Sequence, residues 1–483
     1  MLFNSTEFFL FFPVVVAVYF ALPGRLRWPF LLAASYYFYM AWQPGYVVLI
    51  LISTLVCYAA GLLMGMKPER RGRRPYLFLA LVANLGLLFF FKYYNFFADT
   101  LGPVVPVPLP GSRFLLPLGI SFFTFQSLSY VIEVYRGKWE AERHLGRFAL
   151  YVAFFPQLVA GPIERPGNLL PQFREDHHFD YDRVTNGLKL MAWGLFKKMV
   201  IADRLAMLVD HVYADPTQYD GLPLVLATVC FAFQIFCDFS GYSDIAIGAA
   251  AVLGFRLMDN FRRPYFATSV ADFWRRWHIS LSTWFRDYVY IPLGGNRVAL
   301  RRWHVNILVV FLLSGLWHGA NWTFALWGLV HALYLVAGRA LAPCRERLAI
   351  RTGLARLPRL RHALQVVATF ALVCFAWVFF RANTLSDALH VIAHLPRGWG
   401  VALDPERLAA LVFSLGLTRA ELLFVAAMVV LMELGHAAQS HGSVLAWLGR
   451  RPLWLRWAAY SALVWGVLLF GVFKHKEFVY FTF

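Results

Sequence analysis

The residues best suited to acid–base chemistry are two histidines within an apolar stretch. Residues 305–337 contain no Asp, Glu, Lys or Arg, yet they include His318 and His331. An ionisable side chain inside a membrane span is energetically costly, so it indicates a functional site, and an imidazole accepts a proton near neutral pH. Gly315 and Gly319 flank His318, and such small residues permit a helix break or a close approach. A histidine hydrogen-bonded to a neighbouring helix is the structural alternative.

A metal site on this stretch is disfavoured. His331 follows His318 by 13 residues, about 220° around an ideal helix, so the two side chains would not share a face. The sequence has no HExxH motif, and its five cysteines form no CxxC pair. It also has no GxSxG nucleophile elbow, no P-loop and no GxGxxG motif. We therefore expect no resident metal and no bound cofactor, with a metal site built from residues far apart in sequence as the open alternative.

Two further stretches place polar residues or prolines among apolar residues. The sequence DFSGYSD puts Asp238, Ser240 and Asp244 inside the apolar residues 222–255. Such a group indicates either a polar cavity or a water-facing turn between two shorter helices. The run PQLVAGPIERP at 156–166 has three prolines and cannot form a regular helix. Irregular backbone at membrane depth is tolerated only where protein buries it or where it lines a cavity.

Residues 261–303 combine basic and aromatic side chains, with eight Arg and two Asp in 43 residues. Ser269 followed by Asp272 resembles a capping box and predicts a helix that starts near Val270. Mostly aromatic residues then fall on two adjacent helical stripes: Phe273, Trp277, Trp284 and Tyr288 on one, and Trp274, His278, Leu281 and Phe285 on the other. The segment indicates one aromatic amphipathic helix at the membrane interface, which ends at Pro292 and the glycines after it. An interfacial anchor with snorkelling Arg is the structural alternative.

The composition places these residues in a membrane protein. Of 483 residues, 60% are hydrophobic and only 15% are charged, whereas soluble proteins have about 25% charged residues. A water-soluble enzyme, a disordered chain and a disulfide-rich secreted protein are therefore excluded. Apolar stretches recur at 29–41, 46–65, 76–97, 113–131, 148–163, 187–206, 222–255, 305–337, 364–380, 421–438 and 456–473. We expect an all-α polytopic protein of roughly 10–13 transmembrane or re-entrant helices, organised as a single domain over residues 1–483.

The net charge of +18 is explained in large part by membrane topology. Basic residues accumulate in cytoplasmic loops, and the sequence KPERRGRR at 67–74 and the Arg-rich residues 341–363 fit that pattern. Basic residues also attract anionic lipids. Because the charges lie between apolar spans and not on a soluble domain, nucleic-acid binding is disfavoured. The excess within 261–303 indicates a surface for a phosphorylated cytoplasmic substrate.

Five runs of sequence together resemble the membrane-bound O-acyltransferase (MBOAT) family, in its bacterial alginate and peptidoglycan O-acetylation branch. They are LPLGISFFTFQSLSYVIEVYRG (116–137), FFPQLVAGPIERP (154–166), FCDFSGYSDIAIG (236–248), FWRRWHISLSTWFRDYVYIPLGGNR (273–297) and LSGLWHGANWTFALWGLVH (313–331). The resemblance covers nearly the whole chain. The RRWHISLS and WHGAN motifs, whose histidines are 40 residues apart, are its most specific part.

The resemblance implies a fold, an activity and a set of site residues. The fold would be a ring of tilted helices around a central tunnel. The activity would be transfer of an acetyl group from cytoplasmic acetyl-CoA for O-acetylation of an extracytoplasmic polysaccharide, namely alginate, a related exopolysaccharide or peptidoglycan. His318 of the WHG motif would be the general base, and His278 of the RRWH motif would orient the acyl group or stabilise the oxyanion; an acyl-enzyme relay is the open alternative.

Further candidates are of two kinds. Those for the catalytic site or tunnel are His331, Asn321, Trp317, Asp238, Ser240 and Asp244. Those for binding acyl-CoA are Arg275, Arg276, Trp274, Arg286 and Arg297, since guanidinium groups bind phosphate through paired hydrogen bonds.

The resemblance also implies a location and a partner. The chain would be a multi-pass protein of the bacterial cytoplasmic (inner) membrane, and its acetyl group would pass to a separate periplasmic SGNH-type or related acetyltransferase. D-alanyl transfer to teichoic acid, by relatives that share the WHG histidine, is an alternative within the family. A transporter or flippase would also show many helices and intramembrane histidines. A membrane scaffold for polysaccharide export would predict that both histidines are dispensable.

Overall fold

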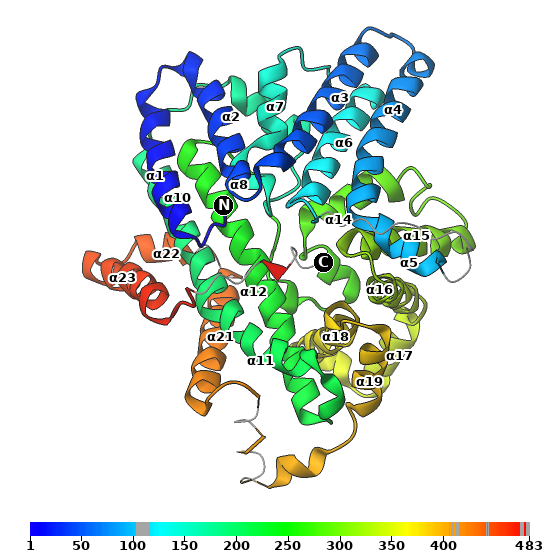
Figure 1. Ribbon diagram of the computed structural model, residues 1–483. Coiled ribbons are helices and arrows are strands. Elements are labelled where there is room, and N and C mark those ends of the chain that lie inside the picture. The colour runs from blue at the N-terminus through cyan, green and yellow to red at the C-terminus, as the bar shows by residue number, and fades with distance from the viewer. Residues whose placement is uncertain are drawn as a thin grey trace. The chain divides into compact units, whose positions relative to one another are not determined.

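The structure, a computed structural model, consists of helices joined by loops (Figure 1). It describes all residues except 103–114, 405, 407–409, 412–414, 441, 443, 474–477 and 480–483. The described residues form helices and no strands, which confirms the predicted all-α class. The chain divides into two compact units: residues 1–194 with 242–259, and residues 195–241 with 260–483. The expectation of one domain over the whole chain stays a prediction.

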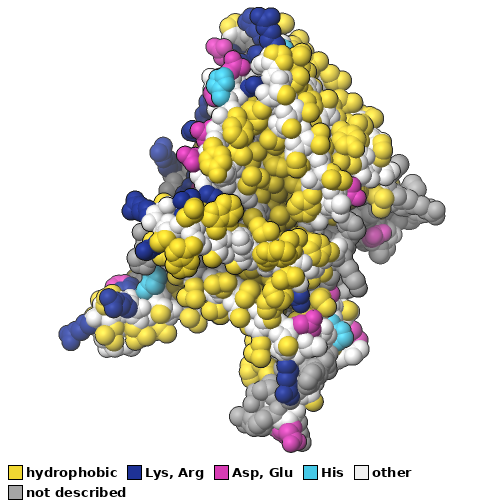
Figure 2. Space-filling model, turned by 90° about the vertical axis from the view of Figure 1, so that its left-hand side faces the viewer, with side chains coloured by type: hydrophobic (Ala, Val, Ile, Leu, Met, Phe, Trp, Pro, Cys, Tyr) yellow, Lys and Arg dark blue, Asp and Glu magenta, His cyan; other side chains and the backbone are white. Residues whose placement is uncertain are grey.

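Seven helical segments in the described part of the chain are long and apolar enough to cross a membrane. They are Pro44–Gly65, Arg70–Leu101, Leu222–Leu253, Trp322–Ala340, Pro358–Arg381, Arg419–Gln439 and Leu453–Phe470. Many large hydrophobic side chains are exposed on them. Figure 2 shows a face that is largely hydrophobic, with most charged side chains near its margins. Lipid solvates such a surface, whereas in water it would promote aggregation, and the chain is therefore a multi-pass membrane protein.

The first unit is built mainly from the N-terminal helices. These are α1 (Thr6–Ala21), α2 (Gly24–Met40), α3 (Val47–Gly65), α4 (Arg70–Leu88), a π-helical turn (Phe89–Tyr93), α5 (Tyr94–Leu101), α6 (Ile120–Arg136), α7 (Leu145–Ala153), α8 (Phe155–Leu158), α9 (Pro166–Leu169) and α10 (Tyr181–Leu195). Helices α3, α4 and α6 pack against one another, and α2 packs against α7.

The run 156–166 is irregular, as its prolines require. It passes from the single turn α8 through non-helical residues to the single turn α9. The segment is buried, and the Glu164 side chain has no exposure. The Glu164 carboxylate accepts hydrogen bonds from Asn168 Nδ2 (2.6 Å) and from the backbone N–H of Met258 (2.6 Å). Protein therefore buries the irregular backbone, and burial raises the pKa of Glu164 to about 7.

The second unit carries most of the remaining helices. They are a π-helical segment (Phe196–Ala202), α11 (Asp203–Ala214), α12 (Leu222–Leu253), α13 (Val270–Trp274), α14 (Ile279–Phe285), α15 (Leu300–His318), α16 (Trp322–Ala340), α17 (Ala342–Arg351), α18 (Pro358–Arg381), α19 (Leu385–His394), α21 (Arg419–Gln439), α22 (Val444–Gly449) and α23 (Leu453–Phe470). Helix α12 is continuous, and its last residues belong to the first unit. A turn between two shorter helices at DFSGYSD is therefore wrong.

The uncharged stretch folds into two helices, α15 and α16, that pack against each other. Helix α15 ends at His318, so the break predicted beside that residue is confirmed. A Cβ atom on Gly315 would lie 2.2 Å from the carbonyl oxygen of Phe324, and one on Gly328 would lie 2.2 Å from that of Phe311. Only glycine permits backbones to approach so closely. The two glycines therefore fix the position of the end of α15.

The aromatic segment forms two short helices, the second of which continues into a π-helical turn (Arg286–Tyr290), so the expectation of one continuous helix is wrong. Its start is as predicted, because Ser269 accepts a hydrogen bond from the backbone N–H of Asp272 (3.1 Å). The chain then turns at His278, which has a left-handed φ of 42°. The backbone N–H of Ile279 donates to the carbonyl oxygen of Asn260 (2.9 Å) and not to a preceding helical turn. This tertiary hydrogen bond overrides the helical pattern of the sequence.

Candidate functional site

Three buried histidines of the second unit lie near one another, and two of them pack against Trp327. The centroid of the Trp327 ring lies 5.0 Å from that of His318 and 4.9 Å from that of His331. The His278 ring lies 6.4 Å from the His318 ring, centroid to centroid. All three imidazoles are at most 2% exposed. Because His318 and His331 belong to different helices, the angle expected from one continuous helix does not apply, and both rings pack on the same indole.

Asn260 fixes the orientation and the tautomer of the His278 ring. Its Oδ1 atom accepts hydrogen bonds from the backbone N–H of Ser280 (3.3 Å) and from the Ser280 hydroxyl (2.9 Å). Since a backbone N–H can only donate, this atom of the amide is the oxygen. The Nδ1 atom of His278 lies 3.1 Å from the same oxygen and is therefore the protonated nitrogen. The Nε2 atom of His278 consequently carries the lone pair.

The His278 imidazole is neutral at physiological pH. Removal from water disfavours the charged form of a buried histidine, and burial lowers the pKa of His278 to about 3. The left-handed backbone at this residue costs of the order of 1–3 kcal/mol for a side chain other than glycine. Such strain persists only where the surroundings impose it, and it concentrates at functional sites.

The indole N–H of Trp327 is a buried donor beside His318. Its Nε1 atom has no hydrogen-bond partner among the residues that the structure describes. By contrast, the Trp274 Nε1 atom donates to His331 Nδ1 (3.3 Å). A buried donor without an acceptor costs about 1–3 kcal/mol, so this one calls for an explanation. A substrate oxygen that gains negative charge during a reaction would satisfy it.

Aromatic rings enclose the histidines. Trp317 packs against His278 at 5.8 Å and against His318 at 5.0 Å, measured between ring centroids. Phe380 packs against His318 at 5.3 Å. Trp274, which the sequence placed with the acyl-CoA candidates, has its ring against His331 at 5.0 Å. Such surroundings exclude water and strengthen electrostatic interactions.

Asp238 and Ser240 belong to a buried charge network of the second unit. The Lys198 ammonium lies 2.7 Å from Asp238 Oδ1 and 2.8 Å from Asp203 Oδ1. The Lys197 ammonium donates to the Ser240 hydroxyl (2.9 Å). All five side chains are at most 3% exposed. One buried cation, Lys198, is thus held between two buried anions, as buried charges require, and Lys197 is bonded to a hydroxyl on the same helix as Asp238.

This network adjoins His278 through a single residue. Phe239 follows Asp238 on α12, and its ring meets the His278 ring edge-on with centroids 4.6 Å apart. The Asp238 Oδ2 atom also accepts the backbone N–H of Val479 (2.7 Å). The ion pairs therefore anchor the part of α12 that packs against the candidate site.

Three other predicted site residues have different environments. Asn321 caps α16, because its side-chain oxygen accepts the backbone N–H of Thr323 (3.0 Å) and its amide donates to the carbonyl oxygen of Asn383 (3.1 Å). Asp244 belongs to the first unit. Arg297 is exposed. The role that the structure gives Asn321 is to start the helix that carries His331.

The other arginines predicted to bind acyl-CoA are paired with acids. Asp272 pairs with Arg275 (3.2 Å) and Arg276 (3.0 Å), and Arg286 pairs with its neighbour Asp287 (2.7 Å). The side chains of Arg275 and Arg286 are 70% and 58% exposed. Exposed ion pairs are worth about 0–1 kcal/mol, so a phosphate can displace them. Their binding to acyl-CoA stays a prediction.

Several residues of this region were not predicted from the sequence. Lys197 and Lys198 carry a signal, since two cations interrupt the apolar residues 187–206 and the argument used for His318 applies to them. Asn260 and Trp327 carry none, because an Asn or a Trp within an apolar chain is common. Among the described residues, no group of three His, Cys, Asp or Glu side chains is arranged to hold a metal ion.

Comparison with known proteins agrees with the resemblance seen in the sequence. A profile of the membrane-bound O-acyltransferase (MBOAT) family matches residues 142–380, which include all three histidines. The chain is 43% identical over 396 residues to the probable alginate O-acetylase AlgI of Pseudomonas aeruginosa. The aligned residues make up 80% of this chain and 73% of that protein.

Two further relatives extend this agreement. The probable alginate O-acetylase AlgI of Azotobacter vinelandii is 42% identical over 401 residues, 81% of this chain and 77% of the relative. The peptidoglycan O-acetyltransferase of Helicobacter pylori is 35% identical over 435 residues, 83% of this chain and 81% of the relative. These similarities agree with an all-helical membrane protein in which the buried histidines of both motifs lie close together. The chain therefore belongs to the membrane-bound O-acyltransferase family and is an acyltransferase.

Proposed function

We propose that this chain takes an acetyl group from cytoplasmic acetyl-CoA and delivers it across the membrane for O-acetylation of an extracytoplasmic polysaccharide. Its relatives are named for alginate and for peptidoglycan, so the polymer is one of these or a related exopolysaccharide. The observation that carries the proposal is the placement of His278 and His318 6.4 Å apart, centroid to centroid, among aromatic rings.

His318 acts as the general base. The centroid separation of the two imidazoles is too long for a direct hydrogen bond between them, and the reacting group of the substrate would bind beside both rings. The acceptor hydroxyl or thiol gives its proton to His318 as its oxygen or sulfur attacks the thioester carbonyl. The carbon–sulfur bond to CoA then breaks, and the thiolate recovers the proton from the imidazolium. General base catalysis of this kind contributes about 10²–10⁴ to the rate.

His278 orients the acyl donor, and Trp327 stabilises the oxyanion. With Nδ1 of His278 donating to Asn260, Nε2 is an acceptor and cannot donate to an oxyanion. Of the two roles that the resemblance implies for His278, orientation therefore fits its tautomer. The amide N–H groups along the pantetheine arm of acetyl-CoA are suitable donors to Nε2. The buried Nε1–H of Trp327 supplies the donor that a tetrahedral intermediate needs.

The remaining parts of the proposal concern location and partners. The chain lies in the bacterial inner membrane, and the exposed Arg275, Arg286 and Arg297, together with the half-buried Arg276, attract the phosphates of the donor. Acetyl-CoA is a substrate, and no resident cofactor is needed for this chemistry. A separate periplasmic SGNH-type acetyltransferase receives the acetyl group and modifies the polymer.

The test is the acetyl content of the exported polymer in cells that carry His318→Ala. We expect acetylation to fall to the background of a deletion strain, with the variant protein present at its normal level. His362→Ala is the matched control, because His362 is exposed at the start of α18. Normal acetylation with His318→Ala would exclude the proposed base. Polymer export that fails together with acetylation would instead favour a transporter or scaffold.

A further inference from the structure

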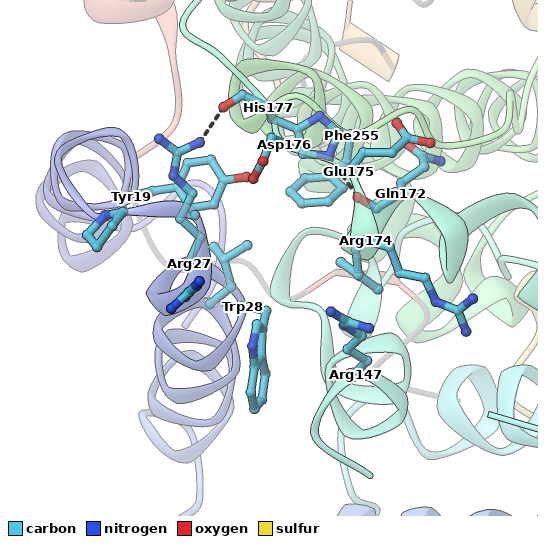
Figure 3. A pocket seen from close by; sticks show the side chains of 15 residues that line it. Tyr19, Arg27, Trp28, Arg147, Gln172, Arg174, Glu175, Asp176, His177 and Phe255 are labelled. Carbon is cyan, nitrogen blue, oxygen red and sulfur yellow. Dashed lines mark hydrogen bonds between the residues drawn. The ribbon is translucent and has the colours of Figure 1, made fainter. Parts of the chain in front are cut away.

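The first unit contains a pocket of about 640 Å³ whose lining residues all belong to that unit. It lies between the start of α2, the start of α7 and residues 172–177 (Figure 3). Four arginines line it, namely Arg25, Arg27, Arg147 and Arg174, together with apolar and aromatic side chains that include Trp28. Each cation in such a pocket must find an anion or water.

Two of the four arginines form hydrogen bonds or ion pairs within the protein that stabilise the fold. Arg27 donates to the backbone carbonyl oxygens of Leu22 and His177, and Figure 3 shows the second of these bonds. Arg174 forms an ion pair with the buried carboxylate of Glu142. These bonds tie the α1–α2 turn and the residues before α7 to the segment around residue 175. These two arginines therefore position the segments that line the pocket, and their bonding does not indicate a ligand.

Arg147 is different, because its Nε atom is buried and has no hydrogen-bond partner in the part of the chain that the structure describes. The residue before it explains its position. A Cβ atom on Gly146 would lie 2.2 Å from the Trp28 ring, so the indole packs directly on the first turn of α7. Figure 3 shows Arg147 beside Trp28. The exposed Arg25 likewise forms no ion pair among the described residues.

Two carboxylates, Glu175 and Asp176, also line the pocket, and neither forms an ion pair with any residue that the structure describes. Asp176 is held near the start of α2, where a Cβ atom on Gly24 would lie 2.5 Å from its Oδ1 atom. The pocket thus presents available cations and available carboxylates. A complementary ligand carries an anionic group together with hydrogen-bond donors such as an amine or hydroxyl groups.

A series of contacts places the pocket at one end of the first unit. Arg174, which lines the pocket, forms an ion pair with Glu142. The next residue, Arg143, accepts a hydrogen bond from the Tyr58 hydroxyl at its carbonyl oxygen (2.6 Å). At the end of α6, Arg73 donates to the carbonyl oxygen of Val134 (3.3 Å). Arg73 belongs to the basic run 67–74, which the positive-inside rule assigns to the cytoplasm. Headgroups of the inner leaflet and phosphorylated metabolites both occur on that side.

We propose that this pocket binds the phosphate of a phosphate ester that also carries hydrogen-bond donors, with Arg147 as the main phosphate-binding residue. A guanidinium binds phosphate through two parallel hydrogen bonds, and basic pockets at the cytoplasmic ends of transmembrane helices bind lipid headgroups. The ester is either a phospholipid headgroup or a soluble nucleotide. The inference does not depend on the proposed roles of the histidines.

The test compares Arg147→Gln with Arg71→Gln in the full-length protein. Arg71 is exposed on the basic run at the same end of the unit, so both variants lose one positive charge on that side. Native mass spectrometry measures binding of phosphatidylethanolamine and phosphatidylglycerol, and calorimetry measures binding of adenosine 3′,5′-bisphosphate. We expect roughly tenfold weaker binding in Arg147→Gln, the loss of one charge-assisted contact, and little change in Arg71→Gln.

The outcomes separate the two sources of phosphate. Weaker lipid binding with unchanged nucleotide binding assigns the pocket to a headgroup, and the reverse assigns it to a soluble phosphate ester. Equal binding of all ligands by Arg147→Gln and Arg71→Gln would overturn the proposal. Arg147→Lys keeps the charge and guards against misfolding, and it should bind more tightly than Arg147→Gln. The acetylation assay with His318→Ala tests the proposed function independently.

Discussion

The buried ammonium of Lys198 predicts a large effect of one substitution. Lys198→Met keeps much of the apolar length of the side chain but removes the charge between Asp203 and Asp238. Each carboxylate lies within 2.8 Å of the ammonium nitrogen. At an effective dielectric constant of about 20, each pair contributes roughly 6 kcal/mol of Coulomb attraction, most of which offsets the cost of removing the charges from water.

The net cost of the substitution follows from what it leaves behind. Without the ammonium, two buried carboxylates face each other, and removing one partner of a buried ion pair costs about 3–5 kcal/mol. At about 2–4 °C per kcal/mol, the unfolding midpoint should fall by roughly 10 °C. Because Phe239 follows Asp238 and packs on His278, the acyl-transfer rate should fall as well.

Thermal unfolding of the purified protein in detergent measures this effect. The exposed Lys67→Met serves as the control, with an expected change below about 2 °C. The double variant Lys198→Met with Asp238→Asn removes one of the repelling charges and should recover part of the loss. A midpoint lowered by less than about 3 °C in the single variant would refute the view that these ion pairs anchor α12. The same view would be refuted if the midpoint of the double variant fell by the sum of the decreases in the two single variants.

Three other predictions concern pH dependence, packing and the oxyanion. The pKa of Glu164 rises from 4.5 to about 7 in the folded protein. The stability that its carboxyl group contributes is therefore present below about pH 4.5, and about 3 kcal/mol is lost as the pH rises past 7. Glu164→Gln should flatten the decline of the unfolding midpoint between about pH 5 and 8, and an unchanged profile would contradict this. Gly328→Ala adds a Cβ atom 2.2 Å from the Phe311 carbonyl oxygen. In unfolding experiments it should destabilise the protein by about 1–3 kcal/mol. Gly466→Ala is the control and should have no such effect, because its Cβ atom would meet nothing within 4 Å. Trp327→Phe keeps a ring beside His318 but removes the N–H, and should lower kcat about 10²–10³-fold with little change in KM; an unaltered kcat would exclude the oxyanion role.

The sequence singles out His318 and His331 because the cost of an ionisable group in an apolar span is visible without a fold; their catalytic role stays a prediction. It also predicted the helix break beside His318, since Gly319 and Ala320 follow that residue directly. The capping of α13 by Ser269 and the irregular run 156–166 were predictable for the same reason. In each case the signal lies within a few neighbouring residues.

The features that the sequence did not reveal depend on distant partners. The aromatic stripe of residues 270–291 is compatible with one helix, and only the hydrogen bonds to Asn260, 18 residues before His278, break it at that histidine. The tautomer of His278 depends on the same amide. Arg147 was not singled out, because its value as a ligand-binding residue comes from a pocket formed by α2, α7 and the segment around residue 175.

The most direct test of the account is acetyl transfer by the purified protein. With acetyl-CoA labelled in its acetyl group, release of free CoA and transfer of label to an acceptor are followed in reconstituted bilayers. We predict turnover by the unaltered chain, a loss of about 10²–10⁴-fold in His318→Ala and near-normal rates in His362→Ala. Turnover by His318→Ala within about threefold of the unaltered protein would contradict the assignment of His318 as the general base.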